Sequence, residues 1–132
     1  MNTFDITVGE FLSIAKQVVD ENPDNVNPRS GGPGGACMYR NHEGHHCLIG
    51  EILINKLGID YDPGWEGQDA LIIMEDSFQL SVAKIAGNLQ TYADEVYSDD
   101  DPSTLHYPTW GEVWRDFTLS DYGQAALLEG GW

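Results

Sequence analysis

The sequence predicts a mainly helical α+β domain, with about four helices around one core and a short β-hairpin near residues 37–47. Apolar residues recur at helical spacing in four separate stretches, and two of these stretches begin with a capping box. A polar turn between two short segments predicts the hairpin. Because the 132 residues contain no linker and no internal repeat, we expect a single globular domain over residues 1–132.

The first helix is expected from Val8 to the residue before Asn22. Thr7 and Glu10 form a capping box, in which a hydroxyl and a carboxylate each accept a hydrogen bond from the other residue's backbone amide. The helix should stop before Asn22-Pro23, because the residue before a proline avoids the helical conformation. The apolar residues between these ends have the spacing of one helix face: Val8, Phe11, Leu12, Ala15, Val18 and Val19.

Residues 22–36 are rich in Asn, Pro and Gly, show no periodicity and predict a mobile loop. The segment Asn41 to Gly44 has the composition of a tight turn, so the residues on either side are expected to pair as the hairpin. From Cys47 onward the spacing becomes helical again, and Gly58 is a natural C-cap. The apolar stripe of this second helix is Leu48, Ile49, Ile52, Leu53 and Leu57.

Residues 59–69 are acidic and turn-rich, and they predict a second mobile loop. Residues 70–74 form either a short buried strand or the start of a helix, because periodicity does not separate the two in so short an apolar run. Asp76 or Ser77 then caps a long helix. Its buried face is expected to contain Phe78, Val82, Ile85, Ala86, Leu89, Tyr92, Ala93 and Val96.

A third mobile loop is expected near residues 97–108, where another acidic run occurs. Thr109 and Glu112 form a second capping box at the start of the next helix. The buried stripe of that helix is Trp110, Val113, Trp114 and Phe117. A brief final helix is expected near residues 124–128.

The charge balance excludes one class of function. The chain carries 22 acidic residues against 6 Lys and Arg, which gives a formal net charge of −16. Nucleic-acid-binding proteins neutralise phosphates with clustered cations. The cations here stand singly, at Lys16, Arg29, Arg40, Lys56, Lys84 and Arg115. Direct binding of DNA or RNA is therefore not expected, and the negative field favours a positively charged protein partner.

The first residues contain no basic leader, and no stretch approaches the length of an apolar membrane helix. Neither a signal peptide nor contact with a membrane is therefore expected. Two cysteines without a secretion signal indicate reduced thiols. The sequence thus predicts a cytoplasmic location, which would be the host cytoplasm for a phage-encoded protein.

Several short motifs together carry a resemblance. The pattern C-x-Y at Cys37 to Tyr39 is followed by C-L-I-G-x-x-L-x-x-x-L-G from Cys47 to Gly58, by A-x-x-L-Q at residues 86–90 and by T-W-G-E at residues 109–112. Over residues 22–117 the chain resembles a group of small uncharacterised proteins from actinobacteria and their bacteriophages. The resemblance implies such a source but no activity and no catalytic residue. Where that group has a proline or small polar residue before the second cysteine, this chain has His45 and His46.

The segment His42-Glu43-Gly44-His45-His46 contains an H-E-x-x-H pattern. On a helix this spacing places both imidazoles against one zinc ion, with the glutamate as general base. Here Gly44 favours a turn inside the pattern. A metal-dependent hydrolase that binds zinc through His42 and His46, with Glu43 as catalytic residue, is therefore an alternative to the leading hypothesis.

Cys37 and Cys47 leave three alternatives open. Together with His42 and His46 they offer the two thiolates and two imidazoles of a structural zinc site. A disulfide is a second alternative, although the possible hairpin registers place the two cysteines on opposite faces or near the ~7 Å Cα limit for bridging. The simplest alternative is that both are buried, reduced thiols and that no cofactor is bound.

The leading hypothesis is a non-enzymatic acidic interaction protein, phage-encoded, that binds a basic surface of a host protein. If the acidic loops lie on one face, their carboxylates would form a row that can occupy a groove made for nucleic acid, so the chain would act as a nucleic-acid mimic or inhibitor. An exposed tryptophan would serve as an anchor. The residues expected to contact the partner are Asp62, Trp65, Glu66, Asp69, Asp99, Asp100 and Asp101.

Overall fold

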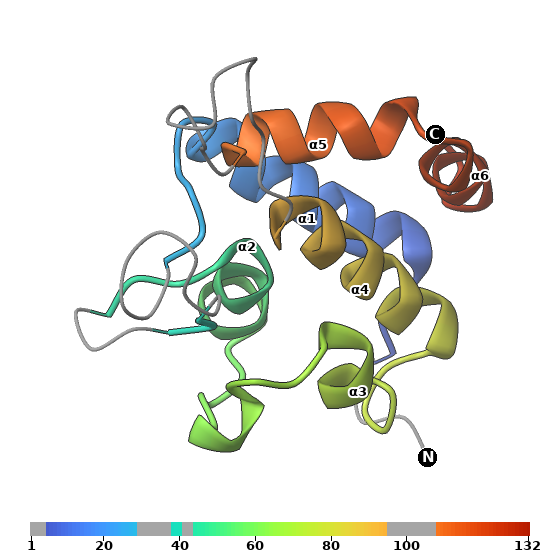
Figure 1. The fold of residues 1–132 in the computed structure, drawn as a ribbon. Helices are drawn as coiled ribbons and strands as arrows, with labels where there is room; N and C mark the ends of the chain where they lie inside the picture. Colours follow the sequence, from blue (N-terminus) through green and yellow to red (C-terminus); the bar gives the residue numbers. More distant parts are fainter. Residues whose placement is uncertain (1–4, 29–37, 41–43, 95–107) are drawn as a thin grey trace.

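The structure is a computed structural model that describes residues 5–28, 38–40, 44–94 and 108–132. This part of the chain is built from helices joined by turns (Figure 1). None of these helices is long and apolar enough to cross a membrane. The elements are the α-helices α1 (Val8–Glu21), α2 (Leu48–Gly50), α3 (Ala70–Met74), α4 (Leu80–Asp94), α5 (Trp110–Leu119) and α6 (Asp121–Glu129), the π-helix η1 (Glu51–Lys56) and the 3-10 helix η2 (Pro63–Trp65).

The core lies where α1, α2, α4 and α5 meet. α4 contacts α2, α3 and α5, while α1 contacts α5, α6 and η1. Figure 1 shows α6 end-on, so that it runs across the end of α5. The largest fully buried side chains come from several of these elements and from the segment before α2: Trp110, Tyr39, Phe11, Phe117 and Met74. The apolar stripes of separate helices thus close on one another, as the helical spacing predicts.

The expected β-hairpin, and with it the α+β class, is wrong. The described residues contain no β-strand, and their one β-type pairing is an isolated antiparallel bridge between Arg40 and His46. The ladder does not continue because Cys47 is already the N-cap of α2. Its thiol accepts a hydrogen bond from the Gly50 amide at 3.2 Å, and its carbonyl accepts one from the Glu51 amide at 2.8 Å. The backbone groups that a strand would need are therefore used by a helix.

Both predicted capping boxes are confirmed. In α1 the Thr7 hydroxyl accepts from the Glu10 amide at 3.1 Å, and in α5 the Thr109 hydroxyl accepts from the Glu112 amide at 3.2 Å. α1 ends at Glu21, immediately before the Asn-Pro pair. These boundaries follow from contacts between residues close in sequence.

Two elements differ from expectation in extent, and the structure decides the alternative left open for residues 70–74. Residues 70–74 are helical, and the Asp69 carboxylate caps them by accepting from the Leu71 amide at 3.0 Å. The long helix α4 begins only at Leu80, because the Phe78 amide still bonds the Met74 carbonyl at 2.9 Å in the turn that closes α3. α6 is longer than the brief helix expected near residues 124–128, since it spans the nine residues Asp121–Glu129. The predicted end of the α4 face, Val96, lies outside the described residues.

The second helix is confirmed in position but not in type. After the three residues of α2 the hydrogen-bonding pattern widens into the π-helix η1. The helical stretch then ends where predicted, with Gly58 in the left-handed region at φ +69°. π-helical turns are rare and are found frequently at functional sites.

Candidate functional site

A long stretch of the sequence, between Lys56 and Lys84, contains no Lys or Arg. In Figure 1, η2 and α3, which belong to this stretch, lie on the lower side of the molecule. Its exposed carboxylates belong to Asp60, Asp62, Asp69, Glu75 and Asp76, which we call the acidic face. Of the predicted partner-binding residues, Asp62 and Asp69 belong to this face.

Asp62 and Asp69 each hold the start of a helical turn. The Asp62 carboxylate accepts from the Gly64 amide at 2.8 Å at the N-terminus of η2, and Asp69 caps α3. A carboxylate at a helix N-terminus is stabilised by the unpaired amides and the helix dipole. Both charges therefore have defined positions on the surface.

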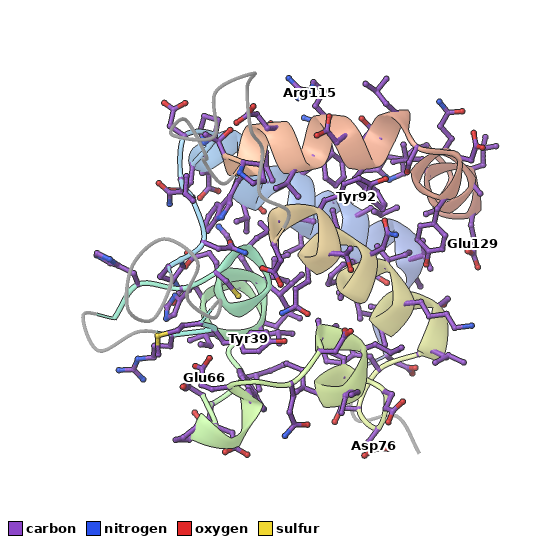
Figure 2. All side chains as sticks on the ribbon, viewed as in Figure 1. Tyr39, Glu66, Asp76, Tyr92, Arg115 and Glu129 are labelled. Atoms are coloured by element: carbon purple, nitrogen blue, oxygen red, sulfur yellow. The ribbon has the colours of Figure 1, made fainter. Side chains whose placement is uncertain are left out.

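Glu66, in contrast, is part-buried and is used inside the protein. Its carboxylate accepts from the backbone amides of Tyr39 at 2.8 Å and Arg40 at 3.2 Å, and also from the Tyr61 hydroxyl. Figure 2 shows Glu66 beside Tyr39, with Asp76 further along the same side. Burial and the neighbouring Glu66 carboxylate raise the pKa of Tyr61 to about 12. Glu66 thus ties the segment before α2 to the turn after η2.

Trp65 is also part-buried and packs against the core. Its ring lies 6.2 Å from the ring of Tyr39 in an edge-on arrangement and 5.7 Å from the ring of Tyr61. Such aromatic contacts stabilise the segment that carries the acidic face. Binding of a partner by Trp65 or Glu66 stays a prediction, as does any role of residues 99–101, which lie outside the described residues.

The cations of the described residues are mostly engaged with carboxylates away from the acidic face. The guanidinium of Arg40 lies 5.5 Å from the ring centre of Tyr61, which stands between Asp60 and Asp62 in the sequence. The ion pairs are Lys16–Asp20 at 2.6 Å, Lys56–Glu21 at 3.1 Å and Arg115–Asp116 at 3.1 Å. None of these three ion pairs involves a carboxylate of the acidic face, although Lys84 and Asp69 line the same pocket beside α4.

Of the predicted zinc ligands, the structure describes only His46 and Cys47, since Cys37, His42 and the possible catalytic residue Glu43 lie outside the described residues. Cys47 is fully buried, and its thiol caps α2. Within the described ranges no three His, Cys, Asp or Glu side chains gather as they would around a metal ion. The zinc and hydrolase alternatives and the state of Cys37 stay predictions.

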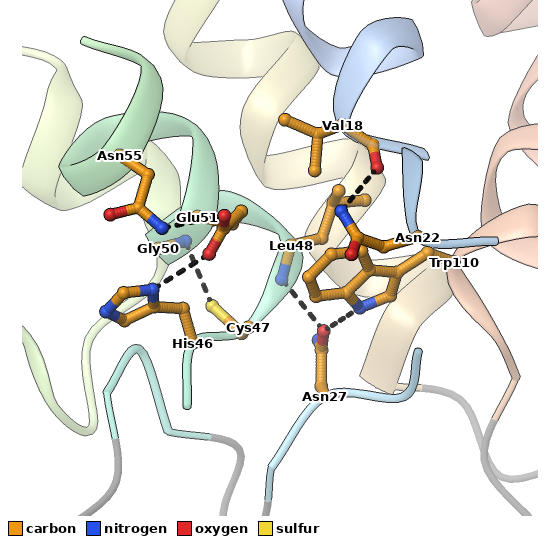
Figure 3. A network of polar contacts seen from close by, with 10 residues as sticks. All are labelled: Val18, Asn22, Asn27, His46, Cys47, Leu48, Gly50, Glu51, Asn55 and Trp110. Carbon is orange, nitrogen blue, oxygen red and sulfur yellow. Dashed lines mark hydrogen bonds and ion pairs between the residues drawn. The ribbon is translucent and has the colours of Figure 1, made fainter. Parts of the chain in front are cut away.

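His46 instead forms part of a polar network with two residues of η1 (Figure 3). Its Nδ1 lies 2.9 Å from Oε2 of Glu51, and the other carboxylate oxygen, Oε1, accepts from the Asn55 amide nitrogen at 2.7 Å. The His46 side chain is 11% exposed and that of Glu51 is 21% exposed. The carboxylate is therefore held at both oxygens in a partly dry environment. The sequence contained no signal for this pair, because neither residue belongs to a recognisable motif with the other.

These residues border a pocket of about 510 Å³ between η1 and the segment after α1. Its polar lining includes Asn22, His46, Glu51 and Asn55, and Val26 contributes an apolar wall. No Lys or Arg is among its described lining residues. A volume of this size is within the range of pockets that bind small ligands or single side chains.

Asn27 fixes one wall of this region and was also missed by sequence reasoning. It is 4% exposed, and its Oδ1 accepts both from the Leu48 amide and from the indole nitrogen of Trp110, each at 2.9 Å (Figure 3). One amide oxygen thus joins the segment after α1 to the starts of α2 and α5. An asparagine in a loop rich in Asn and Pro gives no local indication of such a role.

Comparison of the chain with models of protein families, with curated proteins and with solved structures found no match in any of the three. The resemblance to actinobacterial and phage proteins therefore stays a prediction. Functional inference depends on the geometry described above.

Proposed function

We propose that this chain is a non-enzymatic acidic binding protein that engages a basic surface of another protein through the acidic face. The observation that carries the proposal is the run of five exposed carboxylates over residues 60–76, with no cation in the sequence between Lys56 and Lys84. A group of charges of one sign attracts a partner of the opposite sign and speeds its association. A basic groove that normally holds nucleic acid is a surface of this kind, and a phage protein acting on its host would use it as an inhibitor.

The distribution of the other carboxylates supports a role for charge beyond stability. Asp20 and Glu21 lie in the last turn of α1, and Asp94 and Glu129 end α4 and α6, while the last turns of these helices contain no basic residue. A negative charge at a helix C-terminus is opposed by the helix dipole, at a cost of roughly 0.3–1 kcal/mol for each exposed charge. Ion pairs with Lys16 and Lys56 offset part of this cost for Asp20 and Glu21, whereas α6 ends in Glu129 with no basic residue in its last turn.

The test begins with the immobilised chain and a bacterial lysate at about 0.05 M NaCl, a concentration at which surface charges interact over long distances. Each retained protein is then purified and titrated against the chain at about 0.05 M and about 0.5 M NaCl. We expect a basic protein whose affinity falls steeply with salt. If it is a nucleic-acid-binding protein, a DNA duplex should compete with the chain.

A triple variant, Asp62→Asn/Asp69→Asn/Asp76→Asn, then locates the contact. Asparagine caps helices as well as aspartate does, so the variant keeps the turns at Asp62 and Asp69 while removing three charges. At roughly 0.5 kcal/mol for each exposed pair, the partner's affinity should fall about tenfold.

The matched control removes three exposed charges elsewhere, in Asp5→Asn/Asp24→Asn/Asp121→Asn. This variant should weaken binding by less than about threefold, because its carboxylates lie off the acidic face. Equal weakening by both triple variants would mean that only net charge matters, and the proposal would then be wrong. Failure to retain any basic protein would also refute it.

A further inference from the structure

We propose that the pocket between η1 and the segment after α1 binds a guanidinium group, as in an arginine side chain. The inference goes beyond the acidic face, since it concerns other residues and a ligand recognised by shape and hydrogen bonding as well as by charge.

Two side-chain donors of the lining, the amide nitrogens of Asn22 and Asn55, are engaged internally, which leaves their oxygens for a ligand. The Asn22 amide nitrogen donates to the Val18 carbonyl at 3.1 Å, and the Asn55 amide nitrogen donates to Glu51. A carbonyl and a carboxylate can only accept, so the atoms that face them must carry hydrogen. The amide oxygens of Asn22 and Asn55 have no hydrogen-bond partner among the described residues.

The same reasoning applies to His46. Because Glu51 accepts, Nδ1 of the neutral imidazole carries the proton, and Nε2 is left with a lone pair. Besides the side chains of Asn25 and His45, the lining therefore presents four acceptors: two amide oxygens, one imidazole nitrogen and one carboxylate. A ligand with several donors and no need for an acceptor matches this set, and the planar guanidinium has five N–H donors.

The charge of the pocket selects a cation over a neutral donor. Glu51 is a carboxylate, and Asn55, the neutral donor that holds one of its oxygens, does not cancel its negative charge. Its partial burial makes an ion pair there stronger than one on the open surface. No Lys or Arg is among the described lining residues to pair with a phosphate or carboxylate ligand.

The rest of the lining suits the apolar stem of an arginine. Val26 is 43% exposed and lines the pocket together with Pro28. The methylene groups of an arginine can lie along such a wall while the guanidinium reaches the acceptors. Glu51 and Asn55 both belong to the π-helix η1, and helices of this rare type occur frequently at functional sites.

The probe is Nα-acetyl-arginine amide, titrated into the isotope-labelled chain and followed by NMR at the side-chain amides of Asn22 and Asn55. A single side chain should bind with a dissociation constant on the order of 1 mM. The citrulline analogue has the same shape without the charge and should bind at least about tenfold more weakly. Free arginine is a third arm: tighter binding than the acetylated amide indicates a small-molecule ligand, and equal binding indicates a side chain of a protein.

Two variants locate the site. Glu51→Gln removes the charge with little change of shape and should weaken arginine binding at least about tenfold, whereas Glu75→Gln removes one charge from the acidic face and should change it less than about twofold. Circular dichroism checks that both variants fold. The comparison of arginine with citrulline needs no variant, so a poorly folded Glu51→Gln leaves the test intact.

Absence of a saturable response to the arginine amide, equal binding of citrulline, or equal effects of the two variants would overturn the inference. None of these results bears on the acidic face, which is tested by its own triple variants. If arginine binds here but no basic protein is retained from a lysate, the proposed function fails and the pocket inference stands.

Discussion

Replacement of Asn27 by alanine should destabilise the whole domain, although the residue lies in a loop. Its Oδ1 accepts from the Leu48 amide and from the indole nitrogen of Trp110, and these two residues are 1% and 2% exposed. Alanine would leave both donors buried without an acceptor. The expected effect follows from this loss rather than from the small change in volume.

The magnitude can be worked out from the two donors. A buried donor without a partner costs about 1–3 kcal/mol, so the free energy of unfolding should fall by about 2–6 kcal/mol. Domains of this kind are stable by only about 5–15 kcal/mol, so the loss would be a large fraction of the total. The melting temperature should fall by at least roughly 6 °C, at about 3 °C for each kcal/mol.

Thermal and urea unfolding, followed by circular dichroism, measure the change. The matched control is Asn25→Ala, a neighbouring exposed asparagine whose backbone carbonyl, not its side chain, accepts from the Trp110 amide at 2.7 Å. A double-mutant cycle with Trp110→Phe removes one of the two donors. In that background Asn27→Ala should cost about 1–3 kcal/mol less.

A loss below about 0.5 kcal/mol for Asn27→Ala would refute the reasoning, because surface substitutions have effects of that size. It would mean that the two donors reach water or another acceptor once the side chain is removed. Equal losses for Asn27→Ala and Asn25→Ala would refute it as well. If Asn27→Ala lowered the free energy of unfolding equally in the parent protein and in Trp110→Phe, the loss would not come from the contact between Asn27 and Trp110.

Two further predictions concern the segment before α2. Glu66→Gln should lower the pKa of Tyr61 from about 12, because the negative charge that opposes ionisation is gone while burial remains, and ultraviolet absorbance during alkaline titration would measure it. Since the pKa of Tyr61 in the folded state is raised above the ordinary value of about 10, the neutral phenol stabilises the fold below pH ~10. In the parent protein this stability is lost as pH rises towards 12. An unchanged pKa of Tyr61 in Glu66→Gln would contradict the contact between Tyr61 and Glu66. Gly50→Ala should lower the free energy of unfolding by about 1–3 kcal/mol or more, since the added Cβ would lie 2.3 Å from the Tyr39 carbonyl oxygen. In the control Gly64→Ala, the added Cβ meets only the Asp62 side chain, at 3.2 Å. Equal melting temperatures for these two variants would exclude the close approach of Gly50 to Tyr39.

The helix boundaries could be predicted wherever the atoms that define them are close in sequence. Both capping boxes join residues three positions apart, so the sequence contains the whole contact. The start of α4 could not be predicted in this way. Asp76 and Ser77 are residue types that cap helices, but in the structure they belong to the turn that closes α3. The hairpin failed for a similar reason: a turn composition around Gly44 is equally compatible with a bridge followed at once by a helix.

The candidate sites were predictable only in part. Asp62 and Asp69 could be named from their acidic context, and in the structure both are exposed and cap helical turns, while their binding of a partner stays a prediction. The same context named Glu66 and Trp65, yet the structure holds both part-buried in contact with Tyr39. Composition identifies which residues are charged or aromatic, but burial depends on what packs above them.

The sequence alone determined the helical stretches, their capped N-termini and the excess of negative charge, because these depend on composition and on contacts within a turn of helix. Tertiary structure decided which polar side chains became internal. Asn27 meets Leu48 across 21 residues and Trp110 across 83, and Glu66 meets Tyr39 across 27. No periodicity marks such contacts, since a side chain acquires its hydrogen-bond partners only when packing of the apolar faces brings distant segments together and excludes water from between them.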